Sequence, residues 1–185
     1  MQQWASTNDV NLRHDPVGCL IASAFVPSGY SAAWPLLIAM AMFGANRALA
    51  NWRTATVCAA GHVLGTLASE GIIAYRIAHG LLPESDSRII DVGPSYIVVA
   101  AIVIAVLHGS WPARIAAGLD LLLLITVGGI FSGLSTLQVA AVGHATSIVV
   151  AAMLTSAMAW RIRRVTWGSE SGMPQNEPGQ GQSGT

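Results

Sequence analysis

The chain has 185 residues, of which 53% are hydrophobic and only 10% are charged. About a quarter of the residues in soluble domains are charged. This composition therefore excludes an ordinary soluble domain and indicates a helical membrane protein with several spans. The formal net charge is zero, which argues against a nucleic-acid partner. All nine basic residues are arginine, so a Ser-Lys dyad and a Schiff-base lysine are also excluded.

Residues 1–30 form an N-terminal polar and interfacial segment in this interpretation. Residues 1–16 are polar and are predicted to be a loop at the membrane surface. Residues 17–30 are apolar but too short to span a bilayer, which favours an interfacial or re-entrant piece. Acidic residues precede it where a signal peptide has basic ones, so we do not expect a cleaved signal.

Residues 31–160 are predicted to be an all-α transmembrane bundle of about five spans. The expected spans cover residues 31–50, 54–78, 93–107, 114–131 and 137–159. Residues 161–185 are rich in Gly, Ser, Pro, Gln and Glu, which predicts a disordered tail.

The arginines indicate how these spans are oriented. Six of them fall on the side of the C-terminal tail and three on the side of the 80–92 connection. Under the positive-inside rule, this distribution predicts a multi-pass protein of the cell membrane with a cytoplasmic C-terminus.

The second span carries a polar stripe. His62, Thr66 and Glu70 recur every four residues and so share one helix face, which is expected to turn inward. We considered a structural pair between His62 and Asp120, a cavity-lining or histidine-orienting role for Glu70, and a small transporter that uses the stripe. Gly61 and Gly65 form a G-x-x-x-G pattern that is typical of close helix packing.

Ser95 and His144 are the candidate catalytic residues. Both lie near the outer ends of their predicted spans, with His144 about 10 Å below the start of the last span at 1.5 Å per residue. A serine hydroxyl becomes a nucleophile when a neighbouring base removes its proton, and imidazole suits that task near neutral pH. Two structural alternatives stay open here: Ser95 could cap its own helix, and His144 could bond to a neighbouring helix.

Metal and cofactor chemistry find no support in the sequence. There is no H-E-x-x-H pattern, and the five histidines do not cluster. Cys19 and Cys58 lack metal-ligand spacing and are predicted to be buried core residues. We therefore expect no metal and no cofactor.

Several short motifs resemble those of the rhomboid intramembrane serine proteases. These are Gly93-Pro94-Ser95 at the outer start of one span and Gly143-His144 in the last span. The sequence resembles actinobacterial rhomboid-like proteins more closely, because four further segments look like their motifs. These segments are Ser6-Thr7-Asn8, Gly61-His62-Val63, Asp91-Val92-Gly93 with Ser95-Tyr96, and Val142-Gly143-His144.

The resemblance implies roles for the matching residues. Ser95 would be the nucleophile and His144 the general base of a serine endopeptidase. Gly93 would allow a close backbone approach, and the amide of Ser95 would contribute to the oxyanion hole. Transmembrane proteins would be the substrates or clients, within a lipid bilayer and with no nucleic acid.

Two positions depart from the family pattern. Tyr96 stands where the G-x-S-G motif has its second glycine, and residues 32–42 contain no counterpart of the family's earlier His and Asn. The alternative is therefore a catalytically inactive rhomboid-fold protein that binds transmembrane helices. Rhomboid cores have six spans, so we expect a further span before residue 1.

Overall fold

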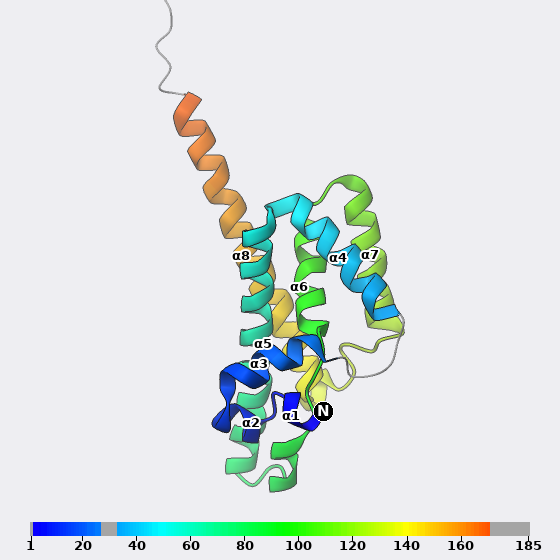
Figure 1. Cartoon of the computed structure of the whole chain (residues 1–185), viewed down its shortest axis with the longest axis vertical. Helices are drawn as coiled ribbons and strands as arrows, with labels where there is room; N and C mark the ends of the chain where they lie inside the picture. The colour runs from blue at the N-terminus through cyan, green and yellow to red at the C-terminus, as the bar shows by residue number, and fades with distance from the viewer. Residues whose placement is uncertain (1, 27–32, 171–185) are drawn as a thin grey trace, which may run out of the picture. The chain divides into compact units, whose positions relative to one another are not determined.

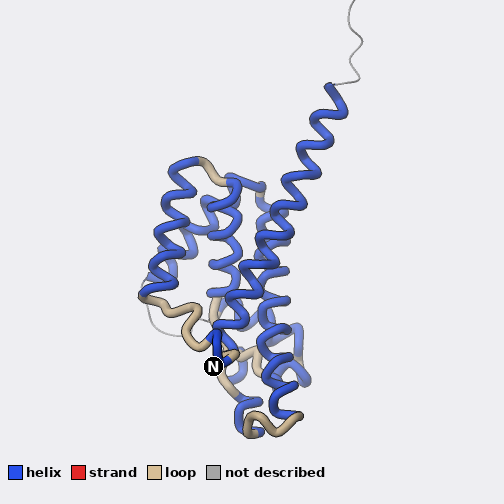
Figure 2. The backbone as a smooth tube through the Cα atoms, turned by 180° about the vertical axis from the view of Figure 1, so that it is seen from behind, coloured by secondary structure: helices blue, strands red, loops and turns tan. Residues whose placement is uncertain are grey.

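The computed structural model describes residues 2–26 and 33–170. Over these ranges every regular element is a helix and no strand occurs, as the tube view shows (Figure 2). The prediction of an all-α fold is therefore confirmed. Residues 1–155 form one compact unit, and a second unit begins at residue 156.

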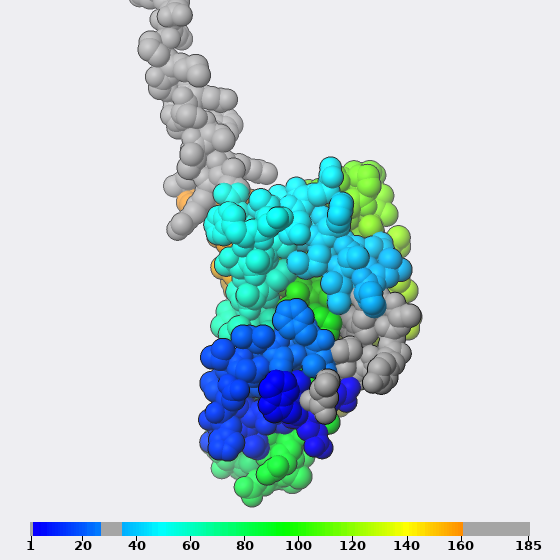
Figure 3. All heavy atoms as spheres, in the orientation of Figure 1, coloured from blue at the N-terminus to red at the C-terminus, as the bar shows by residue number. Residues whose placement is uncertain are grey.

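Three short helices open the chain where a surface loop and an interfacial piece were expected. They are α1 (Gln2–Ala5), α2 (Asp9–His14) and α3 (Pro16–Phe25). The Asn8 side chain caps α2 by accepting from the N–H of Asn11, and the Asp15 side chain caps α3 by accepting from the N–H of Gly18. The space-filling view shows this N-terminal part as a layer below α4 (Figure 3). At ten residues, α3 is too short to cross a bilayer.

The main helices follow in the predicted order. They are α4 (Ala33–Leu49), α5 (Asn51–Ala78), α6 (Ser95–His108), α7 (Trp111–Thr126) and α8 (Val139–Glu170), with 3-10 turns η1 (Glu84–Arg88) and η2 (Leu134–Thr136) between them. From α4 to α7 successive helices run in alternating directions (Figure 1). Residues 171–185, the last part of the predicted disordered tail, lie outside the described residues.

Helix α6 is the centre of the compact unit. Every residue from Val98 to Ala105 is at most 7% exposed, and α4, α5 and α7 all pack against this helix. Its sequence is apolar on all sides, which is the pattern of a helix surrounded by other helices. The start of α6, which carries the candidate nucleophile, is therefore held by the surrounding bundle.

Helices α5 and α8 approach each other closely through the predicted G-x-x-x-G notch. A methyl group added at Gly61 would lie 2.8 Å from the Ser147 hydroxyl, and one added at Gly65 would lie 2.9 Å from the Gly143 carbonyl. These two contacts pair the helices in antiparallel register. The small residues thus bring α8 against α5 near His144.

The outer helix faces carry large apolar side chains that no other described segment covers. Phe43 on α4 is 72% exposed and Leu119 on α7 is 57% exposed, and α5 and α8 also expose apolar residues. Patches of this extent mark a surface made for a membrane or a partner. Two helices, Asn51–Ala78 and the Val139–Trp160 part of α8, are long and apolar enough to cross a bilayer. The expectation of five spans stays a prediction, because α4, α6 and α7 are shorter.

Helix α7 ends earlier than the apolar pattern predicted. Gly129 has a φ of 60°, and the N–H of Ile130 donates to the carbonyl of Leu124. This is the type of helix termination that glycine favours, and Gly128-Gly129 supplies it. The prediction of a span to residue 131 overlooked this signal. The early stop matters because it leaves Ile130 in a loop, where its carbonyl can reach His144.

Candidate active site

Ser95 is the first residue of α6. Pro94 precedes it at the N-cap position, and no side chain caps this helix, so Ser95 does not act as the capping residue. Gly93 has a φ of 131°, a conformation that side chains rarely allow, and its N–H donates to the carbonyl of Ser23 at 2.9 Å. The first-turn N–H groups of α6 are left without a capping side chain.

The loop before α6 is fastened to the N-terminal segment. The N–H of Thr7 donates to the carbonyl of Asp91, and the N–H of Asp91 donates to the Ser6 hydroxyl, each at 2.9 Å. The Thr7 hydroxyl also donates to the Asp91 carboxylate at 3.3 Å. Ser6 and Thr7 are fully buried, so the Ser6-Thr7-Asn8 motif positions the approach to Ser95.

His144 lies on α8 and is 5% exposed. Its Nδ1 is 3.2 Å from the carbonyl oxygen of Ile130. A carbonyl can only accept a hydrogen bond, so Nδ1 must carry the proton, and Nε2 of the neutral ring is an acceptor. Nε2 is buried and has no hydrogen-bond partner among the described residues. This is the tautomer that a general base requires.

Tyr96, the second residue of α6, contacts His144. The two rings meet edge to face, with centroids 4.9 Å apart. The Tyr96 hydroxyl donates to the Asp91 carboxylate at 3.1 Å, and the Tyr96 carbonyl accepts from the Ser147 hydroxyl at 2.8 Å. A methyl group at Gly143 would collide with the Cζ and hydroxyl oxygen of Tyr96. Gly143 therefore makes the space that this tyrosine fills.

Ser95 and His144 lie in the same part of the bundle, but their side chains do not form a catalytic hydrogen bond in this structure. Among the described residues, no hydrogen bond links their side chains. Ser95 is half-buried at the helix start, and the neighbouring Tyr96 packs against the imidazole. The Ser147–Tyr96 hydrogen bond ties the two helices together between these residues.

Glu70 and His62 have neighbours other than those considered from the sequence. Within the described residues Glu70 is not hydrogen-bonded to His144, whose Nδ1 is occupied by Ile130 instead. Glu70 is buried with its carboxyl group hydrogen-bonded to the backbone of Asp9, and its Oε1 has no hydrogen-bond partner among the described residues. His62 Nε2 lies 2.9 Å from the Leu20 carbonyl and 3.2 Å from the Ser23 hydroxyl, so the proposed pair with Asp120 is wrong.

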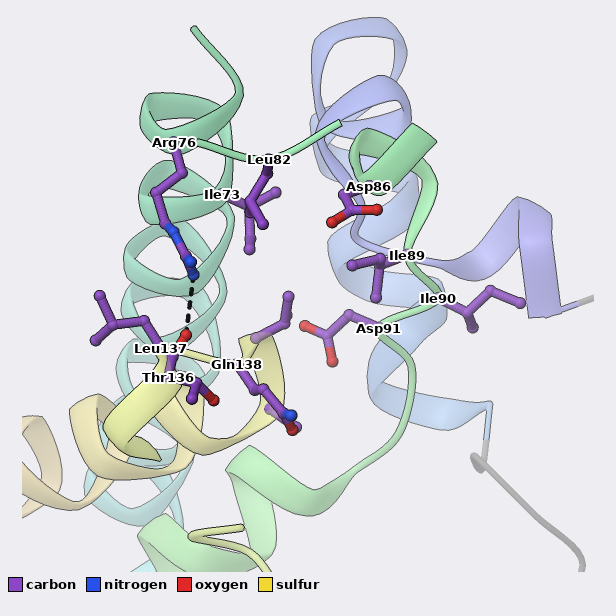
Figure 4. Close-up of a pocket in the computed structure, with 12 residues that line it drawn as sticks. Ile73, Arg76, Leu82, Asp86, Ile89, Ile90, Asp91, Thr136, Leu137 and Gln138 are labelled. Carbon is purple, nitrogen blue, oxygen red and sulfur yellow. Dashed lines mark hydrogen bonds between the residues drawn. The ribbon is translucent and has the colours of Figure 1, made fainter. Parts of the chain in front are cut away.

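Asp91 is the site residue whose role the sequence did not reveal. Burial raises the pKa of its carboxyl group, and the hydrogen bonds from Tyr96 and Thr7 oppose that shift. Asp91 also lines a pocket of about 480 Å³ between the end of α5, the 82–91 connection and the start of α8 (Figure 4). The aspartate in Asp91-Val92-Gly93 was visible as a motif, but only the fold places it under Tyr96.

The exposed apolar helix faces indicate a membrane protein, and the buried histidine lies beside the start of its central helix. The sequence model of the family described as "Rhomboid-like protein" matches residues 1–160. The chain belongs to this rhomboid-like family. No curated protein and no solved structure matched the chain.

Proposed function

We propose that the protein is an intramembrane serine endopeptidase that acts on transmembrane proteins, with Ser95 as nucleophile and His144 as general base. The observation that supports it best is the state of His144. Its Nδ1–H is directed to the Ile130 carbonyl, and Nε2 is kept buried without a partner. A buried acceptor without a hydrogen-bond partner lowers the stability of the fold by about 1–3 kcal/mol. Such a loss is expected where the nitrogen is needed free to accept a proton in a reaction.

The proposed reaction begins with attack by the Ser95 hydroxyl oxygen on a substrate peptide carbonyl. Nε2 of His144 takes the hydroxyl proton and then gives it to the leaving amine, so that the peptide bond breaks and an ester to Ser95 remains. Water then attacks the ester, again with His144 as base, and releases the acid product. The uncapped first-turn N–H groups of α6, including that of Ser95, would stabilise the oxyanion.

This mechanism requires a rearrangement beside His144. Because the Tyr96 ring packs against the imidazole, the first turn of α6 or the ring itself has to shift before Ser95 reaches Nε2. Binding of a substrate segment between these helices would supply the energy for that shift.

The proposal includes a topology. We propose that α4 to α8 each cross the bilayer, with the C-terminus cytoplasmic and the 80–92 connection on the outer side, as the arginine distribution predicts. Ser95 and His144 would then lie in the outer leaflet, where water from the outer face can hydrolyse the ester.

A second candidate function is supported by Tyr96 itself. Its hydroxyl is bonded to Asp91 and its ring is fitted over Gly143, so this side chain has a well-defined place against His144. A stable arrangement of this kind would suit a catalytically inactive rhomboid-like protein that binds transmembrane helices of client proteins.

Fluorophosphonate labelling in membranes separates the two functions. The protease predicts labelling of the wild type that disappears in Ser95→Ala and in His144→Ala. Ser85→Ala, a change in the exposed outer connection, is the matched control and should label like the wild type. Labelling that persists in Ser95→Ala, or that is absent from folded wild-type protein, would refute the protease and support the binding function.

A further inference from the structure

The pocket above Asp91 has the dimensions and chemistry of a binding site. Its volume of about 480 Å³ lies within the range of small-ligand sites and has room for one large side chain with its flanking backbone. Three segments that are distant in sequence surround it: the last turns of α5, the 82–91 connection and residues 136–140. It therefore exists only in the folded protein and lies next to the candidate active site.

The lining combines apolar carbon with an excess of negative charge. Ile73, Ile89 and Val139 supply apolar walls, and Figure 4 shows the carboxylates of Asp86 and Asp91 pointing into the space. These two carboxylates face a single guanidinium, that of Arg76.

Arg76 does not neutralise either acid. Its guanidinium donates to the carbonyl of Thr136 at 2.9 Å, which fixes it at the border of the pocket. Among the described residues, the ion pair that forms is Arg13 with Asp9, outside this pocket. Within the described residues neither Asp86 nor Asp91 therefore has a cation as its partner, and each carboxylate keeps room to accept hydrogen bonds from a cationic group.

We propose that this pocket binds a basic side chain, arginine or lysine, of a peptide segment on the outer side of the membrane. The apolar walls would contact the methylene stem, and Asp86 and Asp91 would accept hydrogen bonds from the charged end. The inference rests on the proposed function in taking the peptide to be the part of a substrate that flanks its membrane span.

Asp91 gives this pocket a direct connection to the candidate active site. The same carboxylate that faces the pocket accepts from the Tyr96 hydroxyl, and the Tyr96 ring contacts His144. A cation that donates hydrogen bonds to the Asp91 carboxylate would compete with the Tyr96 hydroxyl and loosen the tyrosine ring. Substrate recognition would therefore favour the shift that the catalytic mechanism requires.

Binding is tested with the full chain in nanodiscs of neutral phospholipid, in a Ser95→Ala background so that no cleavage occurs. The probes are acetyl-Ala-Arg-Ala-amide and its neutral isostere with citrulline in place of arginine, titrated by saturation-transfer NMR. The arginine peptide should bind at least about tenfold more tightly, the effect of a charge-assisted contact. Asp86→Asn and Asp91→Asn should each remove most of that difference.

Glu84→Gln is the matched control, because Glu84 is in the same connection but does not line the pocket. Equal binding of the two peptides, absence of saturable binding, or equal effects of Asp86→Asn and Glu84→Gln would overturn the inference. If Asp91→Asn does not fold, Asp86→Asn decides the matter alone. The readout is binding, so its failure leaves the labelling test of Ser95 unaffected, and loss of labelling leaves this result standing.

Discussion

The contact between Gly143 and Tyr96 leads to a prediction about stability. In Gly143→Ala the new methyl group would occupy the position of the Tyr96 Cζ and hydroxyl oxygen and would lie 2.7 Å from Cε1. The ring has to move, and its hydroxyl then loses the Asp91 carboxylate. Overpacking costs about 1–3 kcal/mol and a hydrogen bond to a charged group about 1.5–3 kcal/mol, so we expect a loss of about 2.5–6 kcal/mol.

Thermal unfolding in detergent, followed by tryptophan fluorescence, measures this loss. For a chain of this size each kcal/mol lowers the Tm by about 2–4 °C, so Gly143→Ala should unfold at least about 5 °C below the wild type. Gly71→Ala is the matched control, since a methyl group there meets no atom within 4 Å on the same type of helix. It should leave the Tm unchanged or raise it slightly.

A double substitution isolates the contact itself. On a Tyr96→Ala background the ring is gone, so adding Gly143→Ala should have little effect on the Tm or raise it. If Gly143→Ala lowers the Tm equally in the presence and absence of the tyrosine ring, or no more than Gly71→Ala does, the fitted arrangement of Tyr96 over Gly143 is incorrect.

Two further predictions concern the connections of Tyr96. Because burial raises the pKa of Asp91 above its ordinary value of 3.8, the folded state holds the carboxyl proton more tightly than the unfolded state. The stability of the fold therefore falls as the pH rises from the pKa of the unfolded state toward that of the folded state. As the pH rises above about 4, the Tm of the wild type should therefore decrease relative to that of Asp91→Asn, and parallel Tm profiles would contradict the assignment. Ser147→Ala removes the hydroxyl that donates to the Tyr96 carbonyl and should cost about 1 kcal/mol, a Tm lower by about 2–4 °C. An unchanged Tm, equal to that of Ser85→Ala, would show that this bond does not hold α8 to α6.

The helical bundle could be predicted from the sequence because its information is local. Apolar runs and Gly or Pro at their ends located α4, α5 and α6 and the start of α8 within a few residues. Helix α8 continues to Glu170, beyond the predicted end at residue 159 and into the segment that was predicted to be disordered. The exception at the end of α7 also has a local cause, because Gly128-Gly129 was a termination signal within an otherwise apolar run. The short helices α1 and α2 were overlooked, since their caps, such as Asn8, lie among polar residues that also suit a loop.

The side-chain arrangement at the site depends on contacts between distant segments. The order of the motifs indicated that Ser95 and His144 lie near each other, but not which side chain of α6 faces the imidazole. That choice depends on the rotation of α6, which its uniformly apolar sequence does not specify, and on the space above Gly143. Tyr96 was identified as a departure from the family motif, whereas the compensating role of Gly143 became visible only when α8 was placed against α6.

The hydrogen bonds of Asp91 give the N-terminal segment a function beyond covering the bundle. The hydroxyls of Thr7 and Tyr96 both donate to the Asp91 carboxylate. A movement of the segment around Thr7 would therefore change the hydrogen bonding of Asp91 and, through it, the position of the Tyr96 ring. His144, in contrast, is oriented by its hydrogen bond to the Ile130 carbonyl. The imidazole of His144 is thus held by a contact other than the tyrosine that packs against it. Such an arrangement allows Tyr96 to move while His144 keeps the tautomer needed to accept a proton.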